Sequence, residues 1–255
     1  MNKNTPKLSF CITCKNRFSQ ISKTLPKNLE DNFMHKDSIE FVLVDFGSTD
    51  GLQQWIEENF IDYINSGYLK YYYTDELKYW HASIAKNTAH ILAINDIVVN
   101  LDCDNFTGKN GGWFVIENMI KYGPGNIILH QFSNEFGDGS YGRIGMLKSN
   151  FLRVGGYDEN FDPMGYQDTD IILRLRVLGC DCICLSDKEY NQTIPNSKEL
   201  SMKNVDSKEK WQQMNLNNFK KSTQNITSGS LIANKNKTHI GVVKNMYTLE
   251  RDDAK

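Results

Sequence analysis

Two acidic side chains at the end of an apolar run could hold a metal ion. Asp102 and Asp104 lie in the motif LDCD, at the end of the run IVVNL. In an open α/β sheet, ligands bind beyond the carboxyl ends of the strands, so these two carboxylates could hold one hard cation that bridges a diphosphate. A surface turn with two acids is the simpler alternative. A calcium-binding EF-hand loop fits poorly, because its sixth position would be Thr107 where glycine is required.

The motif TCKNR, residues 13–17, follows the first apolar run of the chain. A basic loop that opens a helix suits a nucleotide diphosphate, because both Arg17 and the amino end of the helix favour anions. Cys11 and Cys14 have the spacing of a redox pair, but Cys11 lies inside the predicted strand, whereas redox pairs open a helix. We therefore interpret this loop as part of an anion site.

The motif VDFGSTDG, residues 44–51, also follows an apolar run. Asp45 could accept hydrogen bonds from a base or a ribose. Ser48 or Asp50 could cap the helix that we predict from residue 51, and this second interpretation is compatible with the first. Capping alone does not account for Asp45.

A second acidic pair lies in GGYDENFDPMGYQDTDIILRLRVLG, residues 155–179. Asp168 and Asp170 fall in the first turn of a predicted helix, where the helix dipole stabilises ionised carboxylates. A carboxylate at the rim of a metal–diphosphate site could remove a proton from an incoming hydroxyl group. Ordinary helix capping by Asp168 is the alternative.

The elements that must position these residues form a regular series. Apolar, β-rich runs recur about thirty residues apart, which is the length of a strand plus a crossover helix. We predict strands at 8–14, 40–46, 69–75, 96–102 and 126–132, and helices at 51–64 and 83–94. This alternation of strands and helices predicts that residues 1–135 form an open α/β sheet with a mostly parallel core and flanking helices.

The regular spacing of apolar, β-rich runs ends after residue 135. The glycine-rich segment FGDGSYGRIG, residues 136–145, predicts a mobile loop over the donor, followed by a strand at 144–148 and a helix at 167–178. We assign residues 1–135 to a nucleotide-binding half and residues 136–186 to an acceptor or catalytic half of one domain, 1–186. Residues 187–255 are rich in Asn and Lys and predict a partly helical extension, weakly ordered after about residue 221.

Composition excludes several classes of protein. The chain has 255 residues, 40% of them hydrophobic, and a formal net charge of −2 without a dense basic run, which argues against binding of nucleic acid. We find no signal peptide and no apolar stretch of membrane-spanning length, so we expect a cytoplasmic protein with reduced cysteines. Peripheral attachment to the inner face of the membrane stays open.

Taken together, TCKNR, VDFGSTDG, HASIAKN, LDCD and the segment 155–179 resemble inverting GT-A glycosyltransferases of the family-2 type. The last segment is also similar to the C-terminal half of β-1,4-galactosyltransferases and chondroitin polymerases. The resemblance covers residues 8 to about 186 in the right order. It implies a Rossmann-like GT-A fold and a divalent cation, Mn²⁺ or Mg²⁺.

The resemblance also implies a role for each matching residue. A nucleotide-sugar donor would be bound by Thr13, Asn16, Arg17, Asp45, Lys86, Asp102 and Cys103, with Asp45 at the base. Asp104 would be the direct metal ligand, assisted by Asp102. Asp168 stands where the family has its catalytic base. The acceptor would be bound by Met164, Gly165, Tyr166 and Gln167.

The sequence departs from the family pattern at three places. Gln167 replaces the customary glutamate beside the base, and Met164 stands where galactosyltransferase-like members carry a tryptophan that stacks on the acceptor sugar. The family often has a histidine metal ligand after the last core strand. The segment KEYNQTIPN, residues 188–196, contains none, which leaves Asn191 as a speculative ligand and His239 as a remote one.

We therefore predict a metal-dependent enzyme that transfers a sugar with inversion from a nucleotide-diphosphate donor, UDP by resemblance, to a hydroxyl group of a glycan or lipid-linked glycan. Synthesis of bacterial-type surface polysaccharides or glycoconjugates would use such an activity. A non-catalytic nucleotide-sugar or carbohydrate-binding protein is the main alternative, since Gln167 is neutral. A sugar-nucleotide pyrophosphorylase fits less well, because TCKNR lacks the glycines of its phosphate loop.

Overall fold

The core of the protein is a mostly parallel sheet. The structure is a computed structural model and describes residues 5–133, 135, 139–242 and 247–248. In these residues eight strands follow the order β7-β5-β6-β4-β1-β2-β3-β8. Their bounds are β1 Leu8–Cys14, β2 Ile39–Asp45, β3 Leu69–Tyr73, β4 Ile97–Asn100, β5 Ile127–His130, β6 Ile144–Leu147, β7 Asp181–Cys184 and β8 Tyr247–Thr248. β6 runs antiparallel to β4 and β5, and β8 to β3, whereas the other neighbours are parallel.

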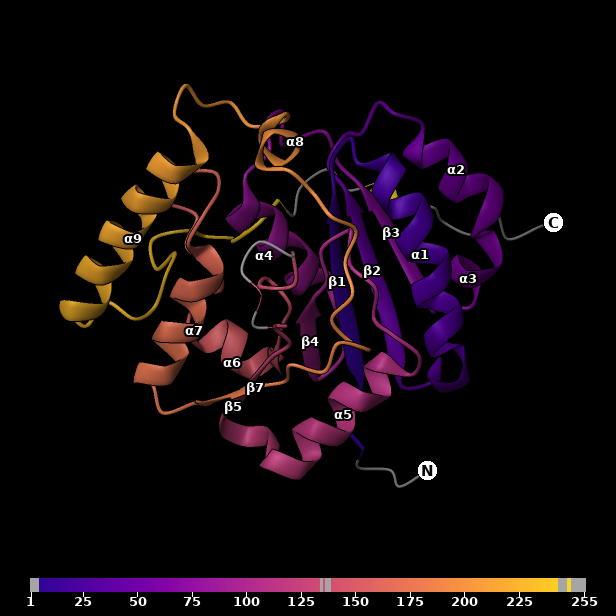
Figure 1. The fold of residues 1–255 in the computed structure, drawn as a ribbon, viewed down its shortest axis with the longest axis horizontal. Coiled ribbons are helices and arrows are strands. Elements are labelled where there is room, and N and C mark those ends of the chain that lie inside the picture. Colours follow the sequence, from indigo (N-terminus) through magenta and orange to yellow (C-terminus); the bar gives the residue numbers. More distant parts are fainter. Residues whose placement is uncertain (1–4, 134, 136–138, 243–246, 249–255) are drawn as a thin grey trace.

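Helices cover both faces of this sheet (Figure 1). Their bounds are α1 Phe18–Asn32, α2 Leu52–Asn59, α3 Ile61–Asn65, α4 Ala82–Leu92, α5 Gly111–Tyr122, α6 Lys148–Arg153, α7 Gln167–Val177, α8 Lys198–Met202 and α9 Trp211–Thr227. Successive side chains of a strand point to opposite faces, so Phe10 and Ile12 of β1 pack with α1, α2 and α5, whereas Cys11 packs with α4, α6 and α7. The predicted α/β fold, with a helical extension after it, is confirmed.

The sheet contains a topological switch point. β1 pairs with β2 on one side and with β4 on the other, and both pairs are parallel. The chain therefore leaves β1 and β4 in opposite directions, which opens a crevice beyond their carboxyl ends. TCKNR follows β1 and LDCD follows β4, so the fold brings these two motifs to one crevice.

The helix predicted at 51–64 is wrong, because the structure has two shorter helices, α2 and α3, in its place. They meet at Phe60, which is buried and packs edge-on against Trp55. Asn59 donates its amide to the carbonyl of Trp55 and so competes with the helical hydrogen bond there. The predicted caps also differ: Asp50 accepts from the N–H of Phe18, at the start of α1, instead of capping its own helix.

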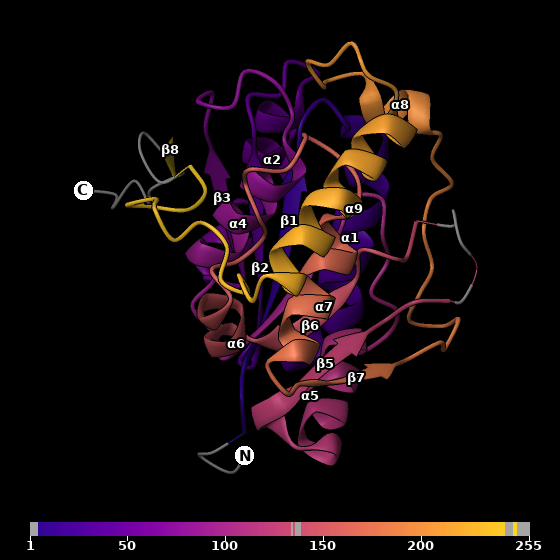
Figure 2. The same ribbon diagram turned by 90° about the vertical axis from the view of Figure 1, so that its left-hand side faces the viewer.

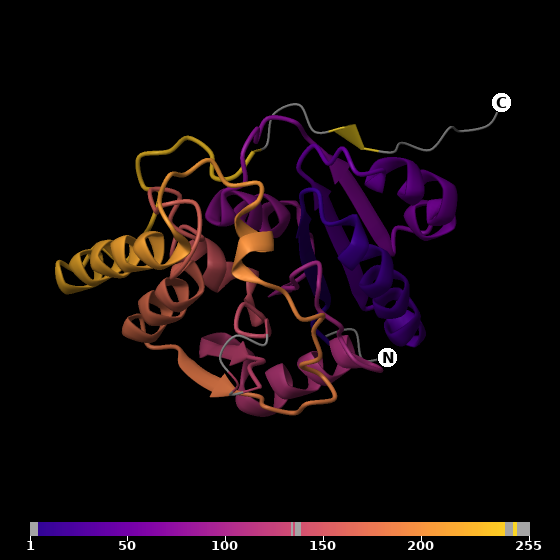
Figure 3. The same cartoon turned by 45° about the horizontal axis from the view of Figure 1, so that its top comes forward.

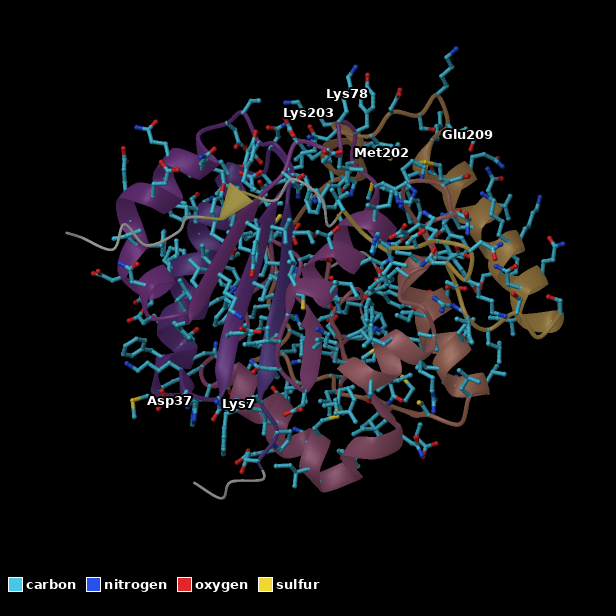
Figure 4. All side chains as sticks on the ribbon, turned by 180° about the vertical axis from the view of Figure 1, so that it is seen from behind. Lys7, Asp37, Lys78, Met202, Lys203 and Glu209 are labelled. Carbon is cyan, nitrogen blue, oxygen red and sulfur yellow. The ribbon has the colours of Figure 1, made fainter. Side chains whose placement is uncertain are left out.

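The C-terminal extension crosses the carboxyl ends of the strands and then runs along α7. In Figure 4, Lys7 and Asp37, which precede β1 and β2, lie at the end opposite to Lys78, Met202 and Lys203. Figure 2 shows α9 lying beside α7 on the outside of the molecule. None of the helices in the described residues is long and apolar enough to span a membrane.

Residues after α9 return to the main domain. The sequence suggested weak order beyond about residue 221, whereas α9 continues to Thr227. Ala233 N–H then donates to the carbonyl of Val154 at 2.9 Å, and Val242 N–H donates to Thr88 Oγ1 at 2.9 Å. The chain between α9 and β8 is thus tied to α4 and to the segment after α6.

Candidate functional site

A cavity of about 690 Å³ lies at the switch point. Its walls come from the loops after β1 and β4, the start of α4, the segment before β6, residues 164–169 and part of the extension. Pockets of this volume commonly hold ligands of the size of a nucleotide sugar. Most of the residues predicted for the site line this cavity: Thr13, Arg17, Lys86, Asp102, Cys103, Asp104, Met164, Gly165, Tyr166, Gln167 and Asp168.

On the donor side, Arg17 and Asp104 form an ion pair across the switch point. Their Nη2 and Oδ2 atoms are 3.2 Å apart. Asp104 is 8% exposed, and its other oxygen accepts a hydrogen bond from Asn105. Burial, together with the neighbouring Asp102 carboxylate, raises the pKa of Asp104 to about 6, although Arg17 acts in the opposite direction. A guanidinium group therefore stands beside the carboxylate that we expect to bind a divalent cation.

Lys86 of α4 joins two acidic residues in the centre of the cavity. Its Nζ atom lies 2.6 Å from Asp168 Oδ1 and 3.8 Å from Asp102 Oδ1. Burial by itself would lower the pKa of Lys86, but the Asp102 and Asp168 carboxylates outweigh it and raise the pKa. A Cβ atom at Gly142 would lie only 2.9 Å from Asp102 Oδ2 and 3.2 Å from Lys86 Nζ, so glycine keeps this cluster open to the cavity.

Asp168 and Asp170 lie in the same turn of α7, but their side chains have different environments. Asp168 faces the cavity, where Gln167 Nε2 donates to its Oδ2 at 3.2 Å. Asp170 is 1% exposed and accepts from Arg174 Nε at 2.8 Å and from Ser222 of α9 at 2.7 Å. Of the two carboxylates, Asp168 is the one that a ligand can reach, whereas Asp170 holds the helix pair together.

The predicted acceptor residues form the wall next to Asp168. Tyr166 has a φ angle of 64°, a left-handed conformation that is uncommon for a residue other than glycine. This turn ends the loop and starts α7, so that Gln167 and Asp168 project into the cavity. The ring of Tyr166 packs edge-on against Phe219 of α9, 5.3 Å between centroids.

Three predicted residues do not line the cavity. Asn16 has its side chain bound to Thr49 and Asn204. Asp45 is fully buried, because it lies on the inner face of β2, where Tyr71 donates to Oδ2 and the Ser48 N–H donates to Oδ1. A ligand could use this carboxylate only if those donors released it.

Asn191, the speculative metal ligand, is the third. It is buried, and its amide donates to the carbonyl of Leu185 at 2.8 Å, within its own segment. Asn196 lies in the cavity instead, with Nδ2 at 3.3 Å from Asp104 Oδ2, and its Oδ1 atom is buried without a partner among the described residues. Within the segment 188–196, the side chain that reaches the cavity is therefore Asn196 and not Asn191.

Sequence reasoning also missed residues of the cavity wall that come from other segments. Trp80, Asn204, Trp211 and Asn215 all contribute. Asn204 connects two of the walls, since it donates to the carbonyl of Lys15 at 2.9 Å and accepts from Trp80 N–H at 2.7 Å through its own carbonyl. Figure 3 shows the extension passing over the middle of the molecule between α9 and the strands. No local pattern marked these residues beyond their aromatic or amide character.

The predicted mobile loop at 136–145 lies only partly within the described residues. Residues 136–138 fall outside them, whereas Gly139, Tyr141 and Gly142 line the cavity. Tyr141 Oη is 3.0 Å from Thr169 Oγ1, which connects the loop to the first turn of α7. The proposed mobility of this loop stays a prediction.

The oxygen atoms near Asp104 suit a hard divalent cation. No group of three or more His, Cys, Asp or Glu side chains forms a cation site in the described part of the chain. Asp102 and Asp104 provide two carboxylates, and Asn196 provides an amide oxygen without a partner. Magnesium typically binds to one or two carboxylates and completes its shell with phosphate oxygens of the substrate and water. These residues therefore fit Mn²⁺ or Mg²⁺ bound together with a diphosphate.

Solved structures of similar fold include a mannosyltransferase and a protein that binds a UDP-sugar. A mannosyltransferase from Pyrobaculum calidifontis, in complex with GDP-Man and Mn²⁺, matches with a TM-score of 0.56 and 19% identity over 72% of this chain and 56% of that one. TarS residues 1–349 from S. aureus, in complex with UDP-GlcNAc, matches with a TM-score of 0.61 and 17% identity over 76% of this chain and 60% of that one. The GT-A fold is thus confirmed, and the chain spans less than two thirds of either protein.

Sequence comparison supports a coarser relationship than the one suggested above. No curated protein matches the sequence, and the similarity to β-1,4-galactosyltransferases and chondroitin polymerases stays a prediction. The model of the family described as Glycosyl transferase family 2 matches residues 9–174. These residues contain both switch-point motifs and Asp168 and make up more than half of the sequence. The chain belongs to glycosyl transferase family 2.

Proposed function

We propose that this chain transfers a sugar from a UDP-sugar to a hydroxyl group of a glycan acceptor, with inversion at the anomeric carbon. One observation carries the proposal: Asp168 lies in the same cavity as Asp102 and Asp104, so a candidate base and a candidate diphosphate site share one space. The structures of similar fold bind nucleotide sugars, which supports this class of donor. UDP itself rests on the family resemblance.

On the donor side, we propose that Asp104, Asp102 and Asn196 hold Mn²⁺ or Mg²⁺. When bound, this ion would neutralise the charge that develops on the departing diphosphate. Arg17 now neutralises Asp104 at 3.2 Å, so donor binding would free its guanidinium group to contact the diphosphate. The cation and the guanidinium group of Arg17 would then both place positive charge beside the departing diphosphate.

On the acceptor side, we propose that Asp168 is the general base. It would accept the proton of the acceptor hydroxyl while that oxygen bonds to the anomeric carbon and the bond to the diphosphate breaks. Attack from the face opposite to the diphosphate inverts the configuration. Lys86 pairs with Asp168 in the free protein, at 2.6 Å. As the donor binds, Lys86 could share its charge with the diphosphate, which would leave Asp168 a stronger acceptor of the proton.

A panel of nucleotide sugars tests this proposal. Thermal unfolding would be followed with UDP-, GDP- and dTDP-sugars, each with Mn²⁺ and with EDTA. A donor at 100 times its dissociation constant should stabilise the fold by about 2.7 kcal/mol. We expect at least one UDP-sugar to stabilise the protein in the presence of Mn²⁺ only. Stabilisation by none of the donors would refute the proposal. Release of UDP from the bound donor would then distinguish the enzyme from a non-catalytic binding protein.

A further inference from the structure

The extension beyond residue 174, where the family match ends, takes part in the cavity. Asn196 lies at Asp104, Asn204 is bound to the loop after β1, and Trp211 with Asn215 lines the side next to Asp168. The segment therefore crosses the whole site, from the metal side to the acceptor side. The extension therefore forms one wall of the cavity.

One residue of α9 fixes the shape of the acceptor loop. Asn218 is fully buried, and its amide N–H groups donate to the carbonyls of Asp162, Met164 and Gly165 at 3.1, 3.3 and 2.7 Å. Its Oδ1 atom accepts from the N–H of Asp162 at 2.7 Å. A single side chain thus binds the backbone of the loop that carries Met164 to Tyr166.

The close approach of α9 also explains the glycine in this loop. Gly165 has a φ angle of 95°, and a Cβ atom there would lie 2.8 Å from the Cβ of Asn215. Only glycine lets the loop reach α9 in this conformation. The loop and the helix therefore form one surface, with Trp211 and Asn215 continuing the wall made by Met164 and Tyr166.

The surface that the loop forms with α9 is largely aromatic and carries no charged side chain. Two cations of the cavity, Arg17 and Lys86, pair with carboxylates of the acidic cluster. Lys15, in the loop after β1, instead binds the backbone carbonyls of Phe46 and Leu77. Next to these cations the wall is made by Trp80, Met164, Tyr166 and Trp211, with Gln167 and Asn215 as amides. An anionic acceptor would find no counter-charge on this wall, whereas an uncharged ligand with one apolar face would fit.

The amide oxygen of Gln167, next to the candidate base, lacks a hydrogen-bond donor among the described residues. Gln167 Oε1 is buried and has no hydrogen-bond partner within the described part of the chain, although its Nε2 atom donates to Asp168. Buried polar atoms in folded proteins nearly always have a hydrogen-bond partner in the protein or in ordered water. A hydroxyl group next to the reacting one could donate to this oxygen.

We propose, on the basis of the function above, that residues 196–218 complete the acceptor subsite and that it binds a neutral pyranoside. One face of a pyranose ring carries only C–H groups, which pack on the electron-rich face of an aromatic ring. Trp211 is the platform for this face, and Gln167 with Asn215 binds the hydroxyl groups at the ring edge. The extension thus determines which acceptor the enzyme uses.

A glycan array tests the class of ligand. Labelled protein would be applied with UDP and Mn²⁺ to an array whose terminal sugars include neutral hexoses, N-acetylhexosamines, deoxyhexoses and uronic acids. We expect binding to neutral pyranosides. Binding to none of them, or only to acidic sugars, overturns the assignment. Because the array does not require turnover, this result is independent of whether the protein transfers a sugar.

Variants of Trp211 test the platform, with the best sugar of the array as acceptor. Trp211→Leu keeps apolar bulk but removes the ring, and we expect the KM for the acceptor to rise about tenfold. Trp211→Phe should restore most of the affinity. Binding of UDP with Mn²⁺, measured without an acceptor, should be retained in both variants. Trp113→Leu is the matched control, because this tryptophan of α5 binds Glu117 and stacks on His35, away from the cavity.

Two results would overturn the role of Trp211. One is an unchanged acceptor KM in Trp211→Leu, and the other is a loss of UDP binding together with acceptor binding, which would mean that Trp211 supports the fold or the donor side. Failure of the proposed function is distinguishable, because the wild-type protein would then neither bind UDP nor hydrolyse the donor.

Discussion

The two sides of the cavity are built in different ways. The proposed donor side consists mainly of charged residues on short loops that directly follow β1 and β4, within the part matched by the family, and Asn196 is the residue that the extension adds to it. Apart from Asp168, the proposed acceptor side is uncharged and largely aromatic, and it forms where residues 162–166 meet α9, more than forty positions later in the chain. The first side depends on sheet topology, whereas the second depends on packing between distant segments. We therefore expect substitutions to separate donor binding from acceptor use.

The largest expected effect concerns Asp168. Asp168→Asn keeps the shape of the side chain and removes the proton acceptor, so the rate of transfer should fall by about 10²- to 10⁴-fold. Binding of UDP with Mn²⁺, measured by calorimetry, should be retained. Asp162→Asn is the control, because Asp162 pairs with Lys221 at 3.0 Å and does not line the cavity. A near-normal rate of transfer by Asp168→Asn would mean that Asp168 stabilises the start of α7 and is not the general base.

The next effect concerns the metal side. Asp104→Asn should weaken Mn²⁺-dependent donor binding by at least about 10²-fold, since even outer-shell substitutions at metal sites cost 10- to 100-fold. Asn196→Ala should cost about tenfold. Titration of Mn²⁺ in the presence of UDP measures both. The matched control is Asn191→Ala, which removes an amide from the same segment without touching the cavity. Equal effects of the two asparagines would remove Asn196 from the site.

The pKa of Asp104 predicts a pH dependence with a defined sign. Burial raises this pKa from 3.8 to about 6, so the free protein favours the protonated carboxyl below that pH. The stabilisation that protonated Asp104 gives the fold is complete below pH 3.8 and is lost as the pH rises through about 6. A cation binds the ionised form, so its affinity should fall about tenfold per pH unit below 6. The Mn²⁺-dependent shift in melting temperature should be large at pH 7.5 and small at pH 5. An equal shift at both values would contradict this assignment.

The smallest effect on the reaction concerns Asn218. Asn218→Ala leaves several buried backbone groups unpaired, which should lower the free energy of unfolding by about 1–3 kcal/mol. It should also raise the KM for the acceptor a few-fold, while UDP binding stays unchanged. Denaturant unfolding and steady-state kinetics measure the two effects. Asn217→Ala removes side-chain hydrogen bonds with Asp162, Glu209 and Gln213 and none to the backbone of the loop, so it should leave the acceptor KM unchanged. A loss of UDP binding in Asn218→Ala would show that the two sides are not separable.

The sequence predicted that TCKNR and LDCD lie at one cavity, because strand periodicity identifies β1 and β4, and their carboxyl ends must converge in a parallel sheet. It predicted Asp168 through the acidic helix start. It could not show that Asp45 is buried and absent from the cavity lining, since this depends on its register with Cys14 and on Tyr71 in the next strand. It also could not place Asn196 or Trp211, because no short-range pattern brings residues 196–218 across the strands. That placement depends on tertiary contacts such as those of Asn204 and Asn218.

The central claim is that the two sides together perform one metal-dependent transfer. The most direct measurement is the release of UDP over time from the stabilising donor, with Mn²⁺ and after addition of EDTA, in the presence of the sugar selected on the array. We predict release that depends on Mn²⁺, increases with the acceptor, and is lost in both Asp104→Asn and Asp168→Asn. Release that is unaffected by EDTA, or a donor that binds but is never turned over with any acceptor, would contradict the account.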